Sequence, residues 1–132
     1  MSTNVLKKIT AVTAGILFMG AVLAADSGMT AFQDGLTAYS KGQWDSAVFL
    51  LKKAAGYPEN FNPDTYYMLI TSEVYAGDNP EALDDCDIFL ENFPDSLLKP
   101  RVDYLKGRIL YSLGEYEKSI IILSDFCHEY DS

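Results

Sequence analysis

Three copies of a short glycine-containing pattern constrain the fold of this chain more than any other feature of its sequence. The pattern reads GQWDSAV from Gly42, GDNPEAL from Gly77 and GEYEKSI from Gly114, so the glycines are 35 and 37 residues apart. Each glycine is preceded and followed by an amphipathic stretch. An internal period of this length is typical of stacked helical hairpins. We therefore predict three pairs of helices, each pair joined at a glycine that ends the first helix in a left-handed conformation.

Proline and glycine positions mark the ends of the predicted helices. Asn62-Pro63 and Asn79-Pro80 each place an asparagine N-cap before a proline at the first helical position, where the missing N–H costs nothing. No segment alternates apolar and polar residues for long enough to predict a strand, so the predicted fold is all-α. The first helices of the pairs are expected over residues 29–41, 63–76 and 99–113, and the second helices over residues 45–55, 80–93 and 117–130.

Apolar residues recur every three or four positions in these helices, which predicts one buried face per helix. That face holds Leu83 and Cys86 in the second pair, and Ile120, Leu123 and Cys127 in the third. The two cysteines lie on corresponding helices of successive pairs, and two interpretations stay open. An oxidising compartment permits a disulfide bond between them, whereas the aromatic neighbours of Cys86 favour a small buried hydrophobic residue.

The N-terminal segment has the composition of a secretory signal. Lys7 and Lys8 precede an uncharged, mostly apolar run that ends in small or β-branched residues at Ala24, which is the pattern of a cleaved signal peptide. Cleavage would remove residues 1–24 and leave one domain, residues 25–132, in the periplasm or secreted. The alternative is an uncleaved membrane anchor, although the run is shorter than the roughly 20 residues that a membrane span needs.

The charge of the chain excludes several classes of partner. Ten Lys and Arg stand against nineteen Asp and Glu, a net charge of −9, which argues against binding to nucleic acid or to anionic lipid. One histidine and two cysteines are too few for a His-rich or four-Cys metal centre. There is no phosphate-binding glycine loop or nucleophile motif. His128 lies beside Cys127, but successive helical residues do not face each other. We therefore expect no enzyme activity, no cofactor and no small-molecule substrate.

The stretch from Ala76 to Leu98 holds seven acidic residues and no basic one. It lacks the alternating acids and glycine of a calcium loop, so a solvated outer helix face is favoured over a cation site. A docking surface for a basic partner around Asp84 and Asp87 remains open.

At the repeated residues the chain resembles the tetratricopeptide repeat (TPR) family. The resemblance covers residues 29–132 and implies a short right-handed α-solenoid of three helix-turn-helix repeats, about residues 28–61, 62–96 and 97–132. The family places a small residue within the first helix, here Gly35, Ile70 and Gly107, and a glycine at the turn, here Gly42, Gly77 and Gly114. An aromatic residue follows the turn, here Trp44, Asn79 and Tyr116. An alanine comes next, here Ala47, Ala82 and Ser119. The departures are Ile70, Asn79 and Ser119. The Phe93-Pro94-Asp95-Ser96 ending is similar to envelope TPR proteins of the outer-membrane assembly or Tol–Pal-associated kind.

The resemblance also implies a binding groove, because the first helices of TPR repeats line the concave face of the solenoid. The residues that would point into it include Tyr67, Arg101, Tyr104, Arg108 and Tyr111. Arginine forks bind carboxylates and tyrosines supply rigid contact area. We expect a non-enzymatic interaction module that holds a peptide or protein segment, a component of the cell envelope, in this groove. The alternative is that the tyrosines are half-buried packing residues and the arginines are solvated charges without a partner.

The last predicted helix is apolar on more than one side. Ile120 to Leu123 are four consecutive apolar residues, which point in all directions around a helix, so one neighbouring surface cannot cover them. We expect an exposed apolar stripe that includes Ile121 and Ile122. Such a stripe marks self-association or contact with further repeats. An alternative function is therefore structural, as a repeat segment that associates end to end in a larger envelope assembly.

Overall fold

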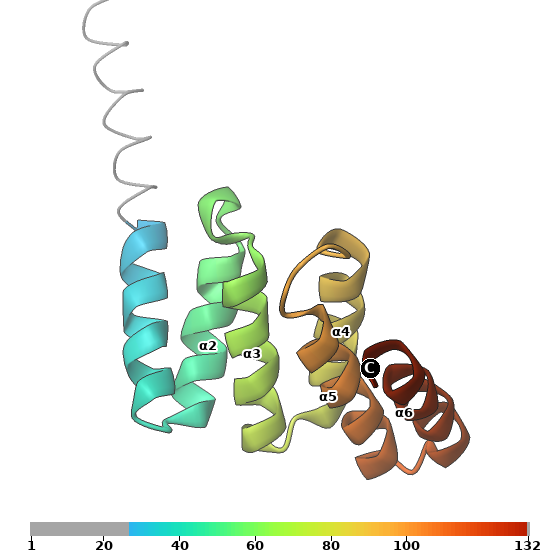
Figure 1. The fold of residues 1–132 in the computed structure, drawn as a ribbon. Coiled ribbons are helices and arrows are strands. Elements are labelled where there is room, and N and C mark those ends of the chain that lie inside the picture. The colour runs from blue at the N-terminus through green and yellow to red at the C-terminus, as the bar shows by residue number, and fades with distance from the viewer. Residues whose placement is uncertain (1–26, 132) are drawn as a thin grey trace, which may run out of the picture.

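The computed structural model describes residues 27–131, and these residues are helical, with no strand among them (Figure 1). The predicted all-α fold is confirmed. The helical elements are residues 27–40, α2 (Trp44–Ala55), the short 3-10 helix η1 (Pro58–Asn60), α3 (Pro63–Ala76), α4 (Asn79–Asn92), α5 (Lys99–Ser112) and α6 (Tyr116–Tyr130). The predicted signal segment, residues 1–24, lies outside the described residues. Within residues 27–131, no helix has the length and apolar character to cross a membrane.

Most helix ends lie where the glycine and asparagine–proline positions of the sequence predict them. Gly42, Gly77 and Gly114 have φ angles of +67°, +85° and +80°, the left-handed conformation that glycine adopts without strain. The Asn62 side chain caps α3 by accepting a hydrogen bond of 2.9 Å from the Thr65 backbone N–H.

The prediction that Asn79 caps the next helix is wrong. Asp78 occupies the N-cap position and Asn79 is the first residue of α4. Only Gly77 and Asp78 separate α3 from α4, so α4 has already begun at Asn79. The Asp78 side chain makes no cap hydrogen bond.

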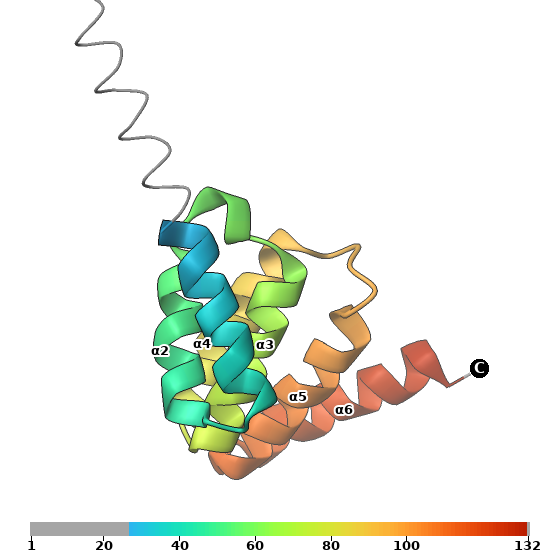
Figure 2. The same ribbon diagram turned by 90° about the vertical axis from the view of Figure 1, so that its left-hand side faces the viewer.

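The helices form a row in which each one packs against the next in the chain. Residues 27–40 and α6 lie at opposite ends of this row (Figure 1). In the view turned by 90°, the C-terminal end of α6 points away from α2 and α3 (Figure 2). The helix at each end of the row therefore has one fewer helix to pack against.

Two apolar clusters form the core, and α6 contributes a fully buried residue to neither. One cluster joins residues 27–40, α2 and α3 through Ala38, Ala47, Leu51 and Leu69. The other joins α3, α4 and α5, and its buried members are Tyr66, Ile70, Ala82, Cys86, Phe89, Val102 and Ile109.

Small residues let the two helices of a hairpin approach closely. A Cβ atom on Gly107 would lie 2.4 Å from Leu123 Cδ2, and one on Gly35 would lie 2.9 Å from Leu51 Cδ2. The Ser119 hydroxyl donates a hydrogen bond of 2.7 Å to the Gly107 carbonyl oxygen across the same contact. Serine in place of the expected alanine is thus buried with its polar atom satisfied.

The predicted buried face of α6 needs correction. Ile120 is 67% exposed and Cys127 is exposed, while Leu123 is half-buried. The inner face of α6 instead carries Ser119, Ile122, Leu123 and Phe126. Burial of Ile120 and Cys127 would require a second helix against them, and residues 27–131 place none there. Both cysteines are free, so no disulfide joins them. Cys86 is buried in the core, where burial raises the pKa of its thiol.

Candidate interaction surfaces

One face of α5 carries the side chains that the sequence nominates for partner binding. Arg101, Tyr104, Arg108 and Tyr111 follow at intervals of three and four residues, which places them on one side of a helix. All four are exposed, Tyr104 by 44% and Tyr111 by 64%. The fifth nominated residue, Tyr67, lies on α3 and is half-buried.

A hollow of about 340 Å³ brings three of these five residues together. Tyr67 reaches it from α3, Arg101 and Tyr104 from α5, and Phe126 from α6. The remaining lining residues are Pro100 and Leu105. The hollow is therefore aromatic and apolar within, with one guanidinium at its edge. We call it the α5 hollow.

The two arginines of the α5 face are unpaired, in contrast to the lysines around them. The ion pairs among the described residues use Lys52, Lys99, Lys106 and Lys118, and neither Arg101 nor Arg108 takes part in one. These are the only arginines in a chain of net charge −9. The Arg108 guanidinium lies over the Tyr104 ring, 5.9 Å from its centroid, a position in which an aromatic ring attracts a cation. Both guanidinium groups keep their hydrogen-bond donors available for a partner.

Arg108 and Tyr111 extend the face beyond the hollow without lining it. Arg108 borders a separate, small cavity of about 30 Å³ next to Val74 and Ile109. Tyr111 packs against Tyr116 at the start of α6, with ring centroids 5.2 Å apart. The predicted residues thus form a strip along α5, of which the first half is hollowed.

Phe126 is a member of the hollow that the sequence did not nominate. Its ring centroid lies 5.8 Å from that of Tyr104 and 5.0 Å from that of Tyr130. The signal for Phe126 was its place seven residues after Ser119, on the inner face of α6. It was missed because the resemblance assigns the groove to the first helix of each pair.

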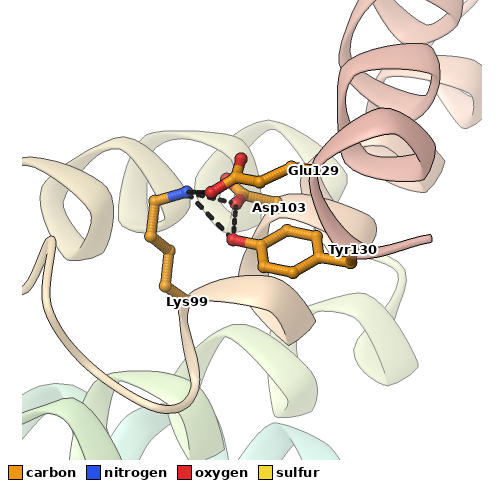
Figure 3. Close-up of polar contacts among 4 residues, drawn as sticks. All are labelled: Lys99, Asp103, Glu129 and Tyr130. Carbon is orange, nitrogen blue, oxygen red and sulfur yellow. Dashed lines mark hydrogen bonds and ion pairs between the residues drawn. The ribbon is translucent and has the colours of Figure 1, made fainter. Parts of the chain in front are cut away.

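A polar cluster joins the end of α6 to the beginning of α5 (Figure 3). Lys99 Nζ lies 2.8 Å from Asp103 Oδ2, 3.2 Å from Tyr130 OH and 3.7 Å from Glu129 Oε1. The Tyr130 hydroxyl in turn donates to Asp103 Oδ2 over 3.4 Å. The hydrogen bond to Asp103 is the main cause that raises the pKa of Lys99 above its usual value. We call these four residues the α5–α6 clasp.

The acidic stretch of α4 divides into a solvated part and a buried part. Asp84 and Asp87 are exposed, as expected, and Asp87 Oδ1 pairs with Lys106 Nζ at 2.5 Å. Asp85 was expected on the same solvated face, but it is 92% buried, since its relative exposure is only 8%. No group of three or more residues that could hold a metal ion occurs in the part of the chain that the structure describes.

Asp85 interacts with a second buried carboxyl, Glu73 of α3. Glu73 is 0% exposed, and both of its oxygens and Asp85 Oδ2 lack a hydrogen-bond partner. Burial is the largest cause that raises the pKa of Glu73, to about 9, and the charge of Asp85 raises it further. Lys52 Nζ, 3.9 Å from Glu73 Oε1, opposes this shift without cancelling it. The raised pKa favours the protonated form of Glu73 in the folded chain.

The two residues nominated for self-association differ in burial. Ile121 is 61% exposed, whereas Ile122 is half-buried. Both line a second hollow of about 340 Å³, together with Leu83 of α4 and Leu110 of α5. The most exposed apolar residue of α6 is instead Ile120.

A comparison of the sequence with models of known protein families finds no match, and a comparison with curated proteins finds none either. Function is therefore argued from the surfaces described above.

Proposed function

We propose that this chain is a non-enzymatic protein-interaction module, built as a three-repeat α-solenoid of the TPR kind. The supporting observations are the left-handed glycine in each of three turns and the close helix approaches at Gly35 and Gly107. The residue five positions after each turn glycine is fully or almost fully buried in all three cases; these residues are Ala47, Ala82 and Ser119. Such periodic packing is what a repeat array needs to share one continuous core.

The binding surface in this proposal is the α5 face, and one observation carries it. The only two arginines of an acidic chain are exposed and form no ion pair with the described residues. Arg101 lines the α5 hollow beside Tyr104, and Arg108 lies over the Tyr104 ring. A guanidinium binds a carboxylate through two parallel hydrogen bonds, and a tyrosine adds contact area at little entropic cost. The partner is an acidic protein segment that inserts an apolar side chain between Tyr67, Tyr104 and Phe126.

A peptide selection followed by charge reversal tests this function. Peptides selected from a display library against the chain should be rich in Asp and Glu around an aromatic or aliphatic residue. Arg101→Glu and Arg108→Glu should each weaken the binding of the best peptide about 10- to 100-fold in fluorescence anisotropy, since hydrogen bonds between charged groups contribute about 1.5–3 kcal/mol each. Both variants should unfold at the same urea concentration as the parent chain, because both side chains are exposed.

The matched control is Lys53→Glu, which makes the same change of charge at an exposed position of α2, outside the hollow. If Lys53→Glu weakens binding as much as Arg108→Glu does, the effect is one of net charge and the α5 face is not the site. Equal affinity of all three variants and the parent would also contradict the proposal, and would favour the acidic surface around Asp84 and Asp87.

We also propose that the chain is exported, on the basis of Lys7, Lys8, the uncharged run and the small residues before Ala25. A periplasmic or secreted location would fit an envelope component as the partner. N-terminal sequencing of the protein from an exporting host should begin near Ala25. An intact Met1 terminus in the membrane fraction would instead identify the segment as an uncleaved anchor.

A further inference from the structure

Four side chains of α6 form an open stripe: Tyr116, Ile120, Leu123 and Cys127. They follow at intervals of four, three and four residues, which aligns them along one face of a helix. Tyr116 is 56% exposed, Ile120 is 67% exposed, Cys127 is exposed and Leu123 is half-buried at the inner edge against Gly107. We call these four residues the open stripe.

The corresponding stripe is covered by a helix in both preceding hairpins. Counted from the turn glycine, the matching residues are Trp44, Val48, Leu51 and Ala55 in α2, and Asn79, Leu83, Cys86 and Leu90 in α4, and none of them is exposed. Trp44 stacks on Tyr75 of α3 with ring centroids 4.6 Å apart. Leu83 and Leu90 pack in the cluster that contains Val102 and Ile109 of α5. The open stripe therefore has the form of a surface that another helix covers.

We propose that the open stripe is covered by the open stripe of a second copy of this chain, with the two α6 helices antiparallel about a two-fold axis. The intervals of four, three and four residues are the same in both chain directions, so the stripe is complementary to itself. Tyr116 would face Cys127 of the second copy, and Ile120 would face Leu123. A two-fold interface uses the same patch on both partners in this way.

The opposite end of the molecule argues against a head-to-tail arrangement. Gln33, Asp34 and Thr37 are exposed on the outer side of residues 27–40. At the positions of Gln33 and Thr37, counted from the turn glycine, α5 carries Leu105 and Ile109, which pack against α4. A second copy that offered residues 27–40 to the open stripe would thus bury polar side chains against Ile120, which is unfavourable.

Charges beside the stripe also fit the antiparallel pairing. Glu117 and His128 are exposed along its outer edge, and the antiparallel register brings Glu117 of one copy near His128 of the other. Charged residues that flank an apolar helix seam set the partner orientation. Because each copy is strongly acidic overall, added salt should strengthen the dimer by screening the repulsion between the copies.

Sedimentation equilibrium on the purified chain and two neighbouring variants tests the dimer. The parent chain should be dimeric at high micromolar concentration, and Ile120→Glu should raise the dissociation constant about 100-fold, as expected for a charge placed at an interface centre. The matched control is Ile121→Glu, which carries the same substitution at a similarly exposed residue outside the stripe and should leave the constant unchanged. Circular dichroism should show both variants folded, since both side chains are exposed.

A monomeric parent chain would overturn the proposal, and so would equal effects of the two variants. A parent chain that stays monomeric but binds a synthetic peptide of residues 99–113 would assign the stripe to a different helical partner, which also contradicts a dimer.

The register of the dimer is tested at Cys127, because Cys86 is buried. In the antiparallel pair, the two Cys127 residues are offset by about 16 Å along the helix axes, given a rise of about 1.5 Å per residue. Mild oxidation should therefore form no disulfide-linked dimer, and spin labels on Cys127 should show the separation. Rapid formation of a Cys127–Cys127 disulfide would indicate parallel helices and overturn the proposed arrangement.

Discussion

α4 and α6 occupy the same place in successive hairpins, yet the two helices differ sharply in burial. Each begins just after a turn glycine and packs against the helix that precedes the turn. α4 buries Ala82, Cys86 and Phe89 completely, whereas the only buried residue of α6 is Ser119. The difference does not come from composition, since α6 has a continuous run of four apolar residues and α4 is rich in acids.

The comparison shows that a helix in this arrangement is buried by the helix that follows it. α5 covers α4, and no helix among the described residues covers α6. The uncovered side chains then become available for partners. Phe126 lines the α5 hollow and Ile120 lies on the open stripe. The core thus lies in the helices up to α5, whereas the proposed binding surfaces lie at α5 and α6.

Truncation of matching phenylalanines should give the largest contrast between the two helices. Phe89 and Phe126 both lie 12 residues after their turn glycines. Phe89→Ala should reduce the free energy of unfolding by about 3–5 kcal/mol, as for a fully buried phenylalanine. Phe126→Ala should cost about 1–2 kcal/mol, because the side chain is only half-buried. Urea denaturation measures both, and equal losses would contradict the comparison.

The buried carboxyls provide a second contrast, because Ile122 of α6 stands at the position of Asp85 in α4. The pKa of Glu73 is raised in the folded chain, so between pH 5 and 9 the folded state holds a proton that the unfolded state has lost, and stability falls as the pH rises. Glu73→Gln should remove this slope and stabilise the chain by about 1–3 kcal/mol at pH 8.

The control for this experiment is Asp84→Asn, at an exposed acid of the same helix, which should leave the slope of stability against pH in place. Thermal unfolding from pH 5 to 9 measures all three chains. If Glu73→Gln destabilises the chain at pH 8, the carboxyl is ionised and paired with Lys52, and the proposed protonation is wrong.

The smallest effect is expected at the α5–α6 clasp. Tyr130→Phe removes the hydroxyl contacts to Lys99 and Asp103 while it keeps the ring that packs on Phe126. The loss should be about 0.5–1 kcal/mol. Hydrogen exchange should become faster in the last turns of α6 and stay unchanged in α4. Faster exchange in both helices would mean that α6 does not open separately from the core.

Most of the fold could be predicted from the sequence because a few neighbouring residues determine where each helix ends. Glycine at the turns and Asn62-Pro63 before α3 fix where the chain changes direction, and these signals depend on a few residues only. The exception is Asn79, which lies inside α4 because only Gly77 and Asp78 separate α3 from α4.

The features that the sequence did not reveal all depend on a second helix. Asp85 looks like one more solvated acid of α4 until Glu73 of α3 is placed against it. Ile120 has the spacing of a core residue, but its exposure is decided by the absence of a covering helix among residues 27–131. Phe126 lines the α5 hollow because α6 packs against α5.

One hollow brings together three of the five residues that the sequence nominates for partner binding, namely Tyr67, Arg101 and Tyr104. Arg108 and Tyr111 continue the same helix face but contact Tyr104 and Tyr116 instead of the hollow. Helical periodicity gives the face of a residue, whereas the depth of a hollow depends on how neighbouring helices tilt.

Chemical-shift mapping with the best selected peptide tests directly whether a partner binds the α5 face. Addition of this peptide to the isotopically labelled chain should shift the signals of Tyr67, Arg101, Tyr104 and Phe126, and leave residues 27–40 and most of α2 unchanged. Shifts concentrated at Asp84 and Asp87 of α4, with the α5 signals unmoved, would place the peptide on α4 and contradict the proposed α5 site.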